Sequence, residues 1–141
     1  MRGLTLPELL IVLVLIGLAA SIALRPVGRA LDRVAVDEGA TRYGAMFETT
    51  RSLAIARGRH ARIELDTARG AVVLSVHADG AQWDTVDQRP LGRARVEASQ
   101  TTATFSPLGV GFGLSNARIV FTSGAAAETL TVSRTGRLKR S

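Results

Sequence analysis

The most constraining feature of the sequence is an uncharged apolar run near its N-terminus. Sixteen consecutive positions, Leu9 to Leu24, carry no charged side chain, and eleven of them are Leu, Ile or Val. A helix that is apolar on every face has to be surrounded by lipid or protein. Counted from Leu4 to Leu24, the 21 residues form roughly 31 Å of helix, which matches a hydrocarbon core about 30 Å thick. The run can therefore span a membrane.

The composition limits what accompanies this run. With 141 residues, 46% of them hydrophobic and 21% charged, the chain is too apolar to be disordered and too short for two compact domains. Cysteine is absent, which excludes disulfides and a thiol nucleophile. The net charge of +6 suggests an anionic partner. Aromatic residues, at 4%, argue against a stacking platform for single-stranded nucleic acid, so nucleic-acid binding would rest on phosphate contacts.

Glu8 discriminates between three interpretations of the apolar run. A cleaved secretory signal would use Ser21-Ile22-Ala23 as its small-residue cut, whereas an ordinary membrane anchor would stay attached. Neither has a use for a carboxylate at the head of the run, where it costs up to a few kcal/mol at bilayer depth. In the third interpretation, Glu8 has a function that the apolar segment depends on.

The residues around Glu8 favour this third interpretation. Gly3-Leu4-Thr5-Leu6-Pro7-Glu8, between a short basic leader and the apolar run, resembles the class III signal of type IV pilins and type II secretion pseudopilins. The resemblance implies that a prepilin peptidase cuts between Gly3 and Leu4, that Leu4 becomes N-methylated, and that Glu8 is retained. The ammonium group of Leu4 in a neighbouring subunit would then pair with Glu8 in the absence of water and set the register of a helical bundle.

Beyond Leu24 the sequence predicts that the helix continues. Apolar residues recur at spacings near three, four and seven: Val27, Leu31, Val34, Val36, Ala40, Tyr43, Phe47 and Ala54. Pro26 and several glycines lower helical propensity, so we expect a bent or locally irregular helix that runs to about Ala56 and stops at Gly58. The charged face is expected to be solvated. An alternative is an anionic-partner patch formed by Arg51, Arg57, Arg59 and Arg62.

After Gly58 the hydrophobic period changes to two, which predicts strands. We expect a hairpin of Arg62–Asp66 and Val72–His77, turns at Asp79-Gly80 and Pro90, and further strands at 95–97, 101–105, 117–121 and 129–133. The fold class predicted is therefore α+β, with a long N-terminal transmembrane α-helix followed by an antiparallel β-sandwich-like globular domain.

Later segments narrow the resemblance. Residues 51–57 are similar to the helix-ending segment of GspH/FimT minor pseudopilins, and residues 105–109 and 135–138 resemble later blocks of that family. The resemblance implies a pilin-like chain divided into a leader (1–3), a membrane and assembly helix (4–24), its periplasmic continuation (25–57) and a β-rich domain (58–141).

The resemblance also implies a function. It describes a GspH-like minor pseudopilin in the bacterial inner membrane, with its globular domain in the periplasm. Such a subunit assembles with other pseudopilins at or near the tip of a pseudopilus for protein secretion, where it contacts other subunits or cargo.

Enzyme chemistry finds little support. His60 and His77 are seventeen residues apart and match no metal-binding spacing, and no G-x-S-x-G nucleophile motif occurs. The glycine-rich segment Gly109–Gly113 lacks the lysine of a phosphate-binding loop, so we expect a flexible loop there, after a type I turn at residues 106–109. Trp83 is expected to be a half-buried core residue. We expect no catalytic residues, no metal and no cofactor.

The C-terminal segment carries a candidate for an anionic partner. Its cations are Arg134, Arg137, Lys139 and Arg140, and a tight turn at Thr135-Gly136 would place Arg134 and Arg137 at one sheet edge, within reach of phosphates. In the FimT branch of the family, which serves DNA uptake in natural transformation, a G-R-x-R element near this point binds DNA. Gly136, Arg137 and Lys139 correspond to it here. The alternative function is therefore a DNA-binding minor pilin, and the other interpretation of these cations is a solvated basic tail.

Overall fold

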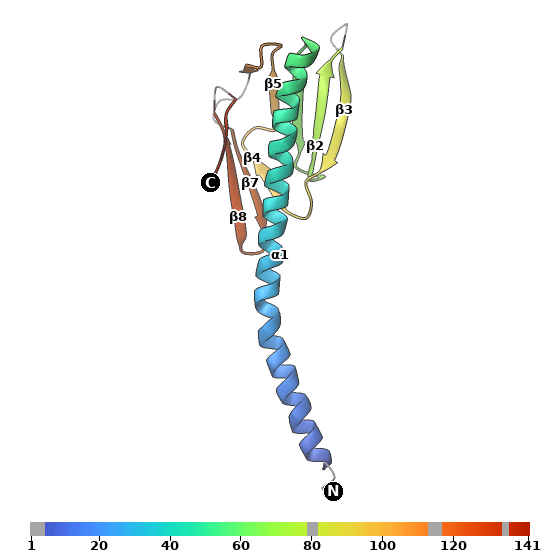
Figure 1. Ribbon diagram of the computed structural model, residues 1–141, viewed down its shortest axis with the longest axis vertical. Helices are drawn as coiled ribbons and strands as arrows, with labels where there is room; N and C mark the ends of the chain where they lie inside the picture. Colours follow the sequence, from blue (N-terminus) through green and yellow to red (C-terminus); the bar gives the residue numbers. More distant parts are fainter. Residues whose placement is uncertain (1–4, 79–81, 113–116, 134–135) are drawn as a thin grey trace.

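The computed structural model describes residues 5–78, 82–112, 117–133 and 136–141, without the side chains of residues 22–25. Within these ranges a single helix, α1 (Leu6–Arg57), is followed by strands only (Figure 1). The strands are β1 (Ala61–Asp66), β2 (Ala71–His77), β3 (Trp83–Pro90), β4 (Arg95–Ala98), β5 (Thr102–Phe105), β6 (Gly111–Phe112), β7 (Ala117–Ser123), β8 (Ala126–Val132) and β9 (Leu138–Arg140).

The strands form two sheets, and every pairing among the described strands is antiparallel. One sheet has the order β3-β2-β1-β5-β6 and the other has the order β4-β7-β8-β9. The C-terminal part of α1 packs against strands of both sheets, while its N-terminal part extends away from them (Figure 1). The predicted α+β, pilin-like fold is confirmed.

The helix begins and ends as its sequence predicts. Pro7 lies in its first turn, where a missing N–H costs nothing, and Gly58 ends it in the left-handed conformation at φ 60°. The backbone N–H groups of Gly58 and Arg59 donate to the carbonyls of Ile55 and Ala54. The expected irregularity at Pro26 takes a mild form, because α1 is helical on both sides of this residue and no break is visible in Figure 1.

The core lies where the sheets meet α1. The predicted helix residues Val36, Ala40, Tyr43, Phe47 and Ala54 are buried. Phe47 meets the Phe105 ring edge to face, with centroids 5.0 Å apart.

Three residues of the predicted apolar face differ from the expectation. Val27, Leu31 and Val34 are exposed, and burial of apolar residues on α1 begins at Ala35. The apolar period of the sequence therefore continues into a part of the helix whose apolar face is not covered by the described chain.

The predicted hairpin is confirmed as β1 and β2, with Ile63 opposite Leu74. The long strand β3 and the short strands β6 and β9 were not predicted. β3 is an edge strand, exposed at most positions and rich in polar residues, so it carries little of the alternation that identifies a strand.

Candidate functional site

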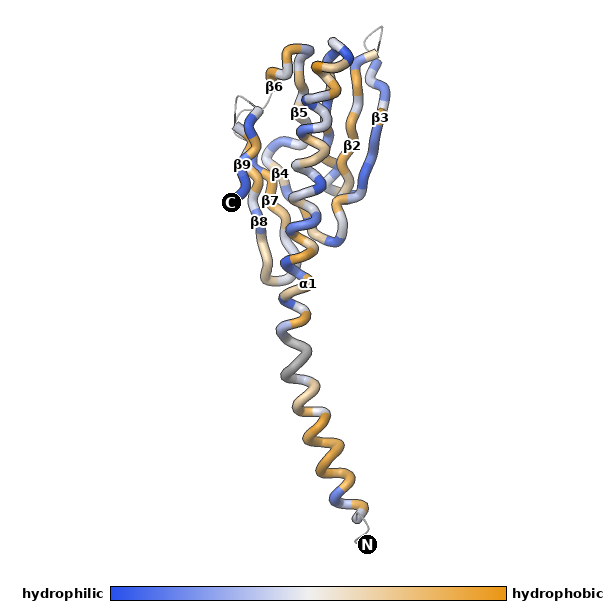
Figure 2. Tube along the Cα trace, viewed as in Figure 1, coloured by the Kyte–Doolittle hydropathy of each residue, from blue (hydrophilic) through white to orange (hydrophobic). Residues whose placement is uncertain are grey.

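The N-terminal part of α1, residues 6–34, has almost no contact with the rest of the chain, and we call it the bare segment. Its most apolar 18-residue window has no buried residue, and by length and composition it is able to cross a membrane. Figure 2 shows this segment mostly in the apolar colour. The described side chains from Leu6 to Leu31 are all exposed. An apolar surface of this size is stable only when lipid or other subunits cover it.

Glu8 lies in the first turn of the bare segment. Its backbone N–H donates to the Thr5 carbonyl at 3.1 Å, and its side chain is exposed. The unpaired N–H groups of the first helical turn favour a carboxylate at this position. Among the described residues, no cation pairs with Glu8. The predicted cleavage and methylation residues, Gly3 and Leu4, lie outside the described residues.

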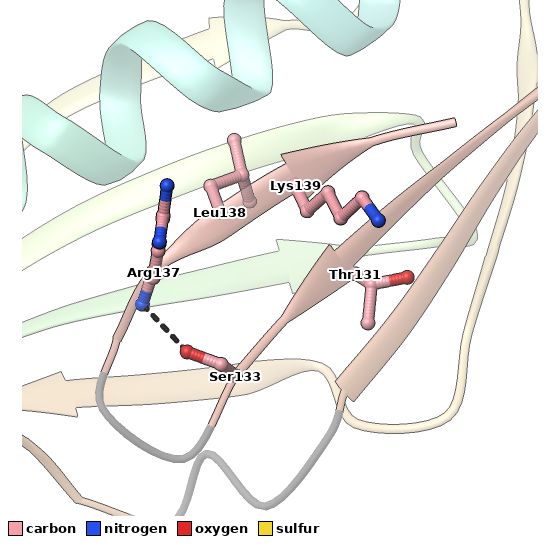
Figure 3. Close-up of a pocket in the computed structure, with 5 residues that line it drawn as sticks. All are labelled: Thr131, Ser133, Arg137, Leu138 and Lys139. Carbon is pink, nitrogen blue, oxygen red and sulfur yellow. Dashed lines mark hydrogen bonds between the residues drawn. The ribbon is translucent and has the colours of Figure 1, made fainter.

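The C-terminal hairpin forms the second candidate site. A groove of about 430 Å³ lies along it (Figure 3), lined by Thr131, Ser133, Arg137, Leu138 and Lys139. Lys139 stands opposite Thr131 on the neighbouring strand. The backbone N–H of Arg137 donates to the Ser133 hydroxyl at 3.1 Å, and Gly136 has φ 75°. The arrangement therefore presents two exposed cations beside two hydroxyl groups, a combination suited to an anion.

The four candidate cations differ in whether a carboxylate already pairs with them. Arg140 bonds Glu128 through Nε and, at 2.9 Å, through a second guanidinium nitrogen, and it also bonds Asp37 on α1. It therefore ties β9 to the helix, and its charge is largely compensated. Arg137 and Lys139 remain for an anion, and Arg134 lies outside the described residues.

The outer face of the five-stranded sheet holds an aromatic cluster. Trp83 is half-buried as expected, but it does not belong to the core. The Arg62 guanidinium covers its ring at 4.5 Å from the centroid. The His77 ring meets Trp83 at 5.2 Å, and His60 lies 6.5 Å from His77. The guanidinium of Arg62 is therefore engaged on the sheet, by the Trp83 ring and by Glu64 at 3.6 Å.

Metal-binding geometry is not found in the part of the chain that the structure describes, where no three His, Cys, Asp or Glu side chains gather. A feature that the sequence reasoning missed lies near the end of α1. Leu108, in the predicted type I turn, and Val110 and Phe112, in the segment expected to be a flexible loop, are exposed apolar residues. Their alternation at every second position was the available signal, and Phe112 lies in the short strand β6.

Comparisons with known proteins agree with this architecture. The family described as type II transport protein GspH matches residues 40–136. The minor pilin FimU of the Pseudomonas aeruginosa type IV pilus superposes with a TM-score of 0.63 at 18% identity, covering 76% of this chain and 88% of FimU. The minor pseudopilin EpsH of the Vibrio cholerae type II secretion system gives 0.63 at 8% identity, covering 77% of this chain and 96% of EpsH. A search of curated proteins gave no match.

Proposed function

Since the chain belongs to the GspH family of type II transport proteins, we propose that it is a minor pseudopilin of type II secretion. In this role it is a structural subunit without enzymatic activity. The bare segment anchors it in the bacterial inner membrane, and the β-rich domain lies in the periplasm. After processing, the subunit enters a pseudopilus at or near its tip, a position that follows from the resemblance to GspH.

The observation that carries this proposal is the position of Glu8. This carboxylate, which pairs with no cation among residues 5–141 as far as the structure describes them, lies in the first turn of a helix whose apolar surface is uncovered. Burying such a charge is costly unless a counter-ion accompanies it. The amino group of Leu4 on an axially displaced neighbour supplies that counter-ion. This pairing gives the bundle of helices a register, because only one axial offset between neighbours satisfies both charges.

The pairing requires a new amino terminus at Leu4. We therefore propose that prepilin peptidase cuts between Gly3 and Leu4 and that Leu4 is then methylated. Mass spectrometry of the N-terminal peptide, taken from membranes of cells that contain the peptidase, tests this directly. The expected peptide begins at Leu4 and carries one methyl group. A peptide that begins near Leu24 would identify an ordinary secretory signal and remove the proposal.

A second candidate function is DNA binding by a minor pilin for natural transformation. The groove with Arg137 and Lys139 favours it, since both cations are exposed beside hydroxyl groups. The test is a gel shift of double-stranded DNA by the full chain in detergent, over a series of salt concentrations. Each phosphate contact contributes about −0.9 to the slope of log affinity against log salt, so these two cations give about −1.8.

The matched variants are Arg137→Ala, beside the groove, and Arg95→Ala, which removes an exposed arginine from the edge strand β4 of the same sheet. We expect Arg137→Ala to flatten the salt slope by about 0.9 and Arg95→Ala to leave it unchanged. The absence of a shift at low salt removes the DNA hypothesis and leaves the pseudopilin proposal intact.

A further inference from the structure

Four exposed apolar residues gather at the end of the molecule farthest from the N-terminus, and we call them the distal patch: Ile55, Leu108, Val110 and Phe112. The Ile55 side chain lies against Gly109, where an added Cβ would meet it at 2.8 Å. Leu108 and Val110 flank this glycine, and Phe112 lies two positions after Val110, in β6. Leu108 is 86% exposed and Phe112 is 55% exposed. Figure 2 shows the apolar colour around β6 at this end.

This patch requires a partner outside the chain. Single exposed apolar residues are common on proteins, but several together mark a binding surface. The membrane of the same subunit cannot cover them, because Ile55 lies 31 helical residues beyond Leu24, or about 46 Å along α1. The end of α1 lies at the opposite end of the molecule from the N-terminus (Figure 1), so the patch is remote from the membrane if the bare segment is in it.

The charges around the patch define the partner's chemistry. Arg51 lies beside Gly109 at the edge of the patch, one turn before Ile55 on α1. Arg57 is exposed at the end of the same helix. Neither arginine has a carboxylate partner among the described residues, although Glu48 precedes Arg51 by three positions. A carboxylate near the apolar contact would therefore find unpaired guanidinium groups.

A second copy of this chain is a poor fit. If two copies met patch to patch, Arg51 and Arg57 of one copy would face the same arginines of the other and repel them. The other exposed apolar stripe beyond the membrane run consists of Val27, Leu31 and Val34. The carboxylate nearest to it on the same helix face among the described residues, Glu38, already pairs with Arg42.

We propose that the distal patch binds a different fibre subunit through an apolar segment flanked by carboxylates. The inference rests on the proposed role as a fibre subunit and adds the surface and the partner to it. Leu108 and Phe112 enter the apolar contact, and Arg51 pairs with a carboxylate at its rim. The chain is then a junction between unlike subunits, because the exposed apolar surfaces of its own described residues beyond the membrane run bring no unpaired carboxylate to the arginines of the patch.

Site-specific photocrosslinking in cells that express the full chain together with the other pilin-like subunits of the system tests this. Leu108 is replaced by benzoylphenylalanine, and Val86, on the edge strand β3 and 42% exposed, is the matched control position. We expect an adduct with a different pilin-like subunit from position 108 only, joined to a peptide that carries Asp or Glu. Arg51→Glu should lower the adduct yield about fivefold, whereas Arg95→Glu should not.

Other outcomes overturn the proposal: an adduct with a second copy, with lipid or with nucleic acid, no adduct at all, or equal losses from both charge reversals. Recovery of the subunit in sheared fibres is measured in the same cells. If the protein enters fibres and position 108 gives no adduct, the docking surface is wrong and the fibre role stands. If it enters no fibre, both are wrong. Melting temperatures of the variants should match that of the parent, since the substituted side chains lie at the surface.

Discussion

The two parts of α1 differ in what surrounds them, although they belong to one unbroken helix. The bare segment, residues 6–34, carries apolar side chains on every face as far as Leu24 and contacts little of the chain. The packed segment, residues 35–57, carries them on one face and buries them against two sheets. The comparison teaches that an apolar surface on every face of a helix requires lipid or neighbouring subunits. An apolar surface on one face is less informative, because residues 35–57 bury theirs within the chain whereas Val27, Leu31 and Val34 remain exposed.

Replacing a large apolar side chain with alanine should give the largest difference in the free energy of unfolding between the two segments. Phe47→Ala leaves a cavity between α1 and β5 and should lower the free energy of unfolding by about 3–5 kcal/mol. Leu13→Ala, in the bare segment, should leave it unchanged, because Leu13 touches no part of the folded domain. Urea unfolding of the full chain in detergent, followed by the fluorescence of Trp83, measures both. Equal losses would contradict the division of the helix.

Glycine substitutions should have opposite signs in the two segments. A Cβ on Gly39 would lie 2.9 Å from the Phe121 ring and 3.0 Å from the Leu91 carbonyl, so Gly39→Ala should cost about 1–3 kcal/mol. Gly28→Ala meets nothing within 4 Å and should stabilise the helix locally by up to about 1 kcal/mol. The same unfolding experiment measures Gly39→Ala, and amide hydrogen exchange around residue 28 measures the local effect of Gly28→Ala. A stabilising Gly39→Ala would show that α1 packs less closely than described.

The packed segment should also respond to alkaline pH. Burial raises the pKa of the Tyr43 hydroxyl well above its ordinary value of 10.0. The folded protein therefore keeps this proton to a higher pH than the unfolded chain does. Stability from this group is complete below pH 10 and falls by about 1.4 kcal/mol per unit above it. Tyr43→Phe should remove this component. If Tyr43→Phe lost as much stability above pH 10 as the parent does, Tyr43 would not be the cause of the alkaline loss.

The smallest effect is expected where the C-terminal strand is attached to the packed segment. Arg140→Ala removes bonds to Glu128 and Asp37, but the arginine side chain is 46% exposed, so the cost should be about 1 kcal/mol or less. Amide hydrogen exchange should show faster exchange in β9 and no change in β1 and β2. Arg95→Ala is the control, and faster exchange throughout the domain would assign Arg140 a larger structural role.

Much of the fold follows from periodicity. The end of the helix at Gly58, the hairpin of β1 and β2 and the buried face around Phe47 could be predicted because local spacing determines them. The exposure of Leu31 could not, since the period of a sequence does not reveal whether a partner lies within the same chain. β3 escaped prediction because an edge strand has no buried face to produce alternation.

The candidate sites, too, could be predicted from the sequence only in part. Glu8 could be identified because a carboxylate at the head of an apolar run contradicts its surroundings. The engagement of Arg140 could not be predicted, since Asp37 lies 103 positions away in the sequence. The alternating apolar residues that include Leu108 and Phe112 were visible in the sequence, but the glycines between them favoured a loop.

The central claim is that Glu8 pairs with the amino terminus of a neighbouring subunit, and its most direct test is incorporation of Glu8→Gln into fibres. Glu48→Gln is the matched control, because it makes the same change at an exposed position of the same helix. Loss of a buried charge pair should lower recovery of Glu8→Gln in sheared fibres by at least about tenfold, with Glu48→Gln at the parental level. Equal recovery of both variants and the parent would contradict the account.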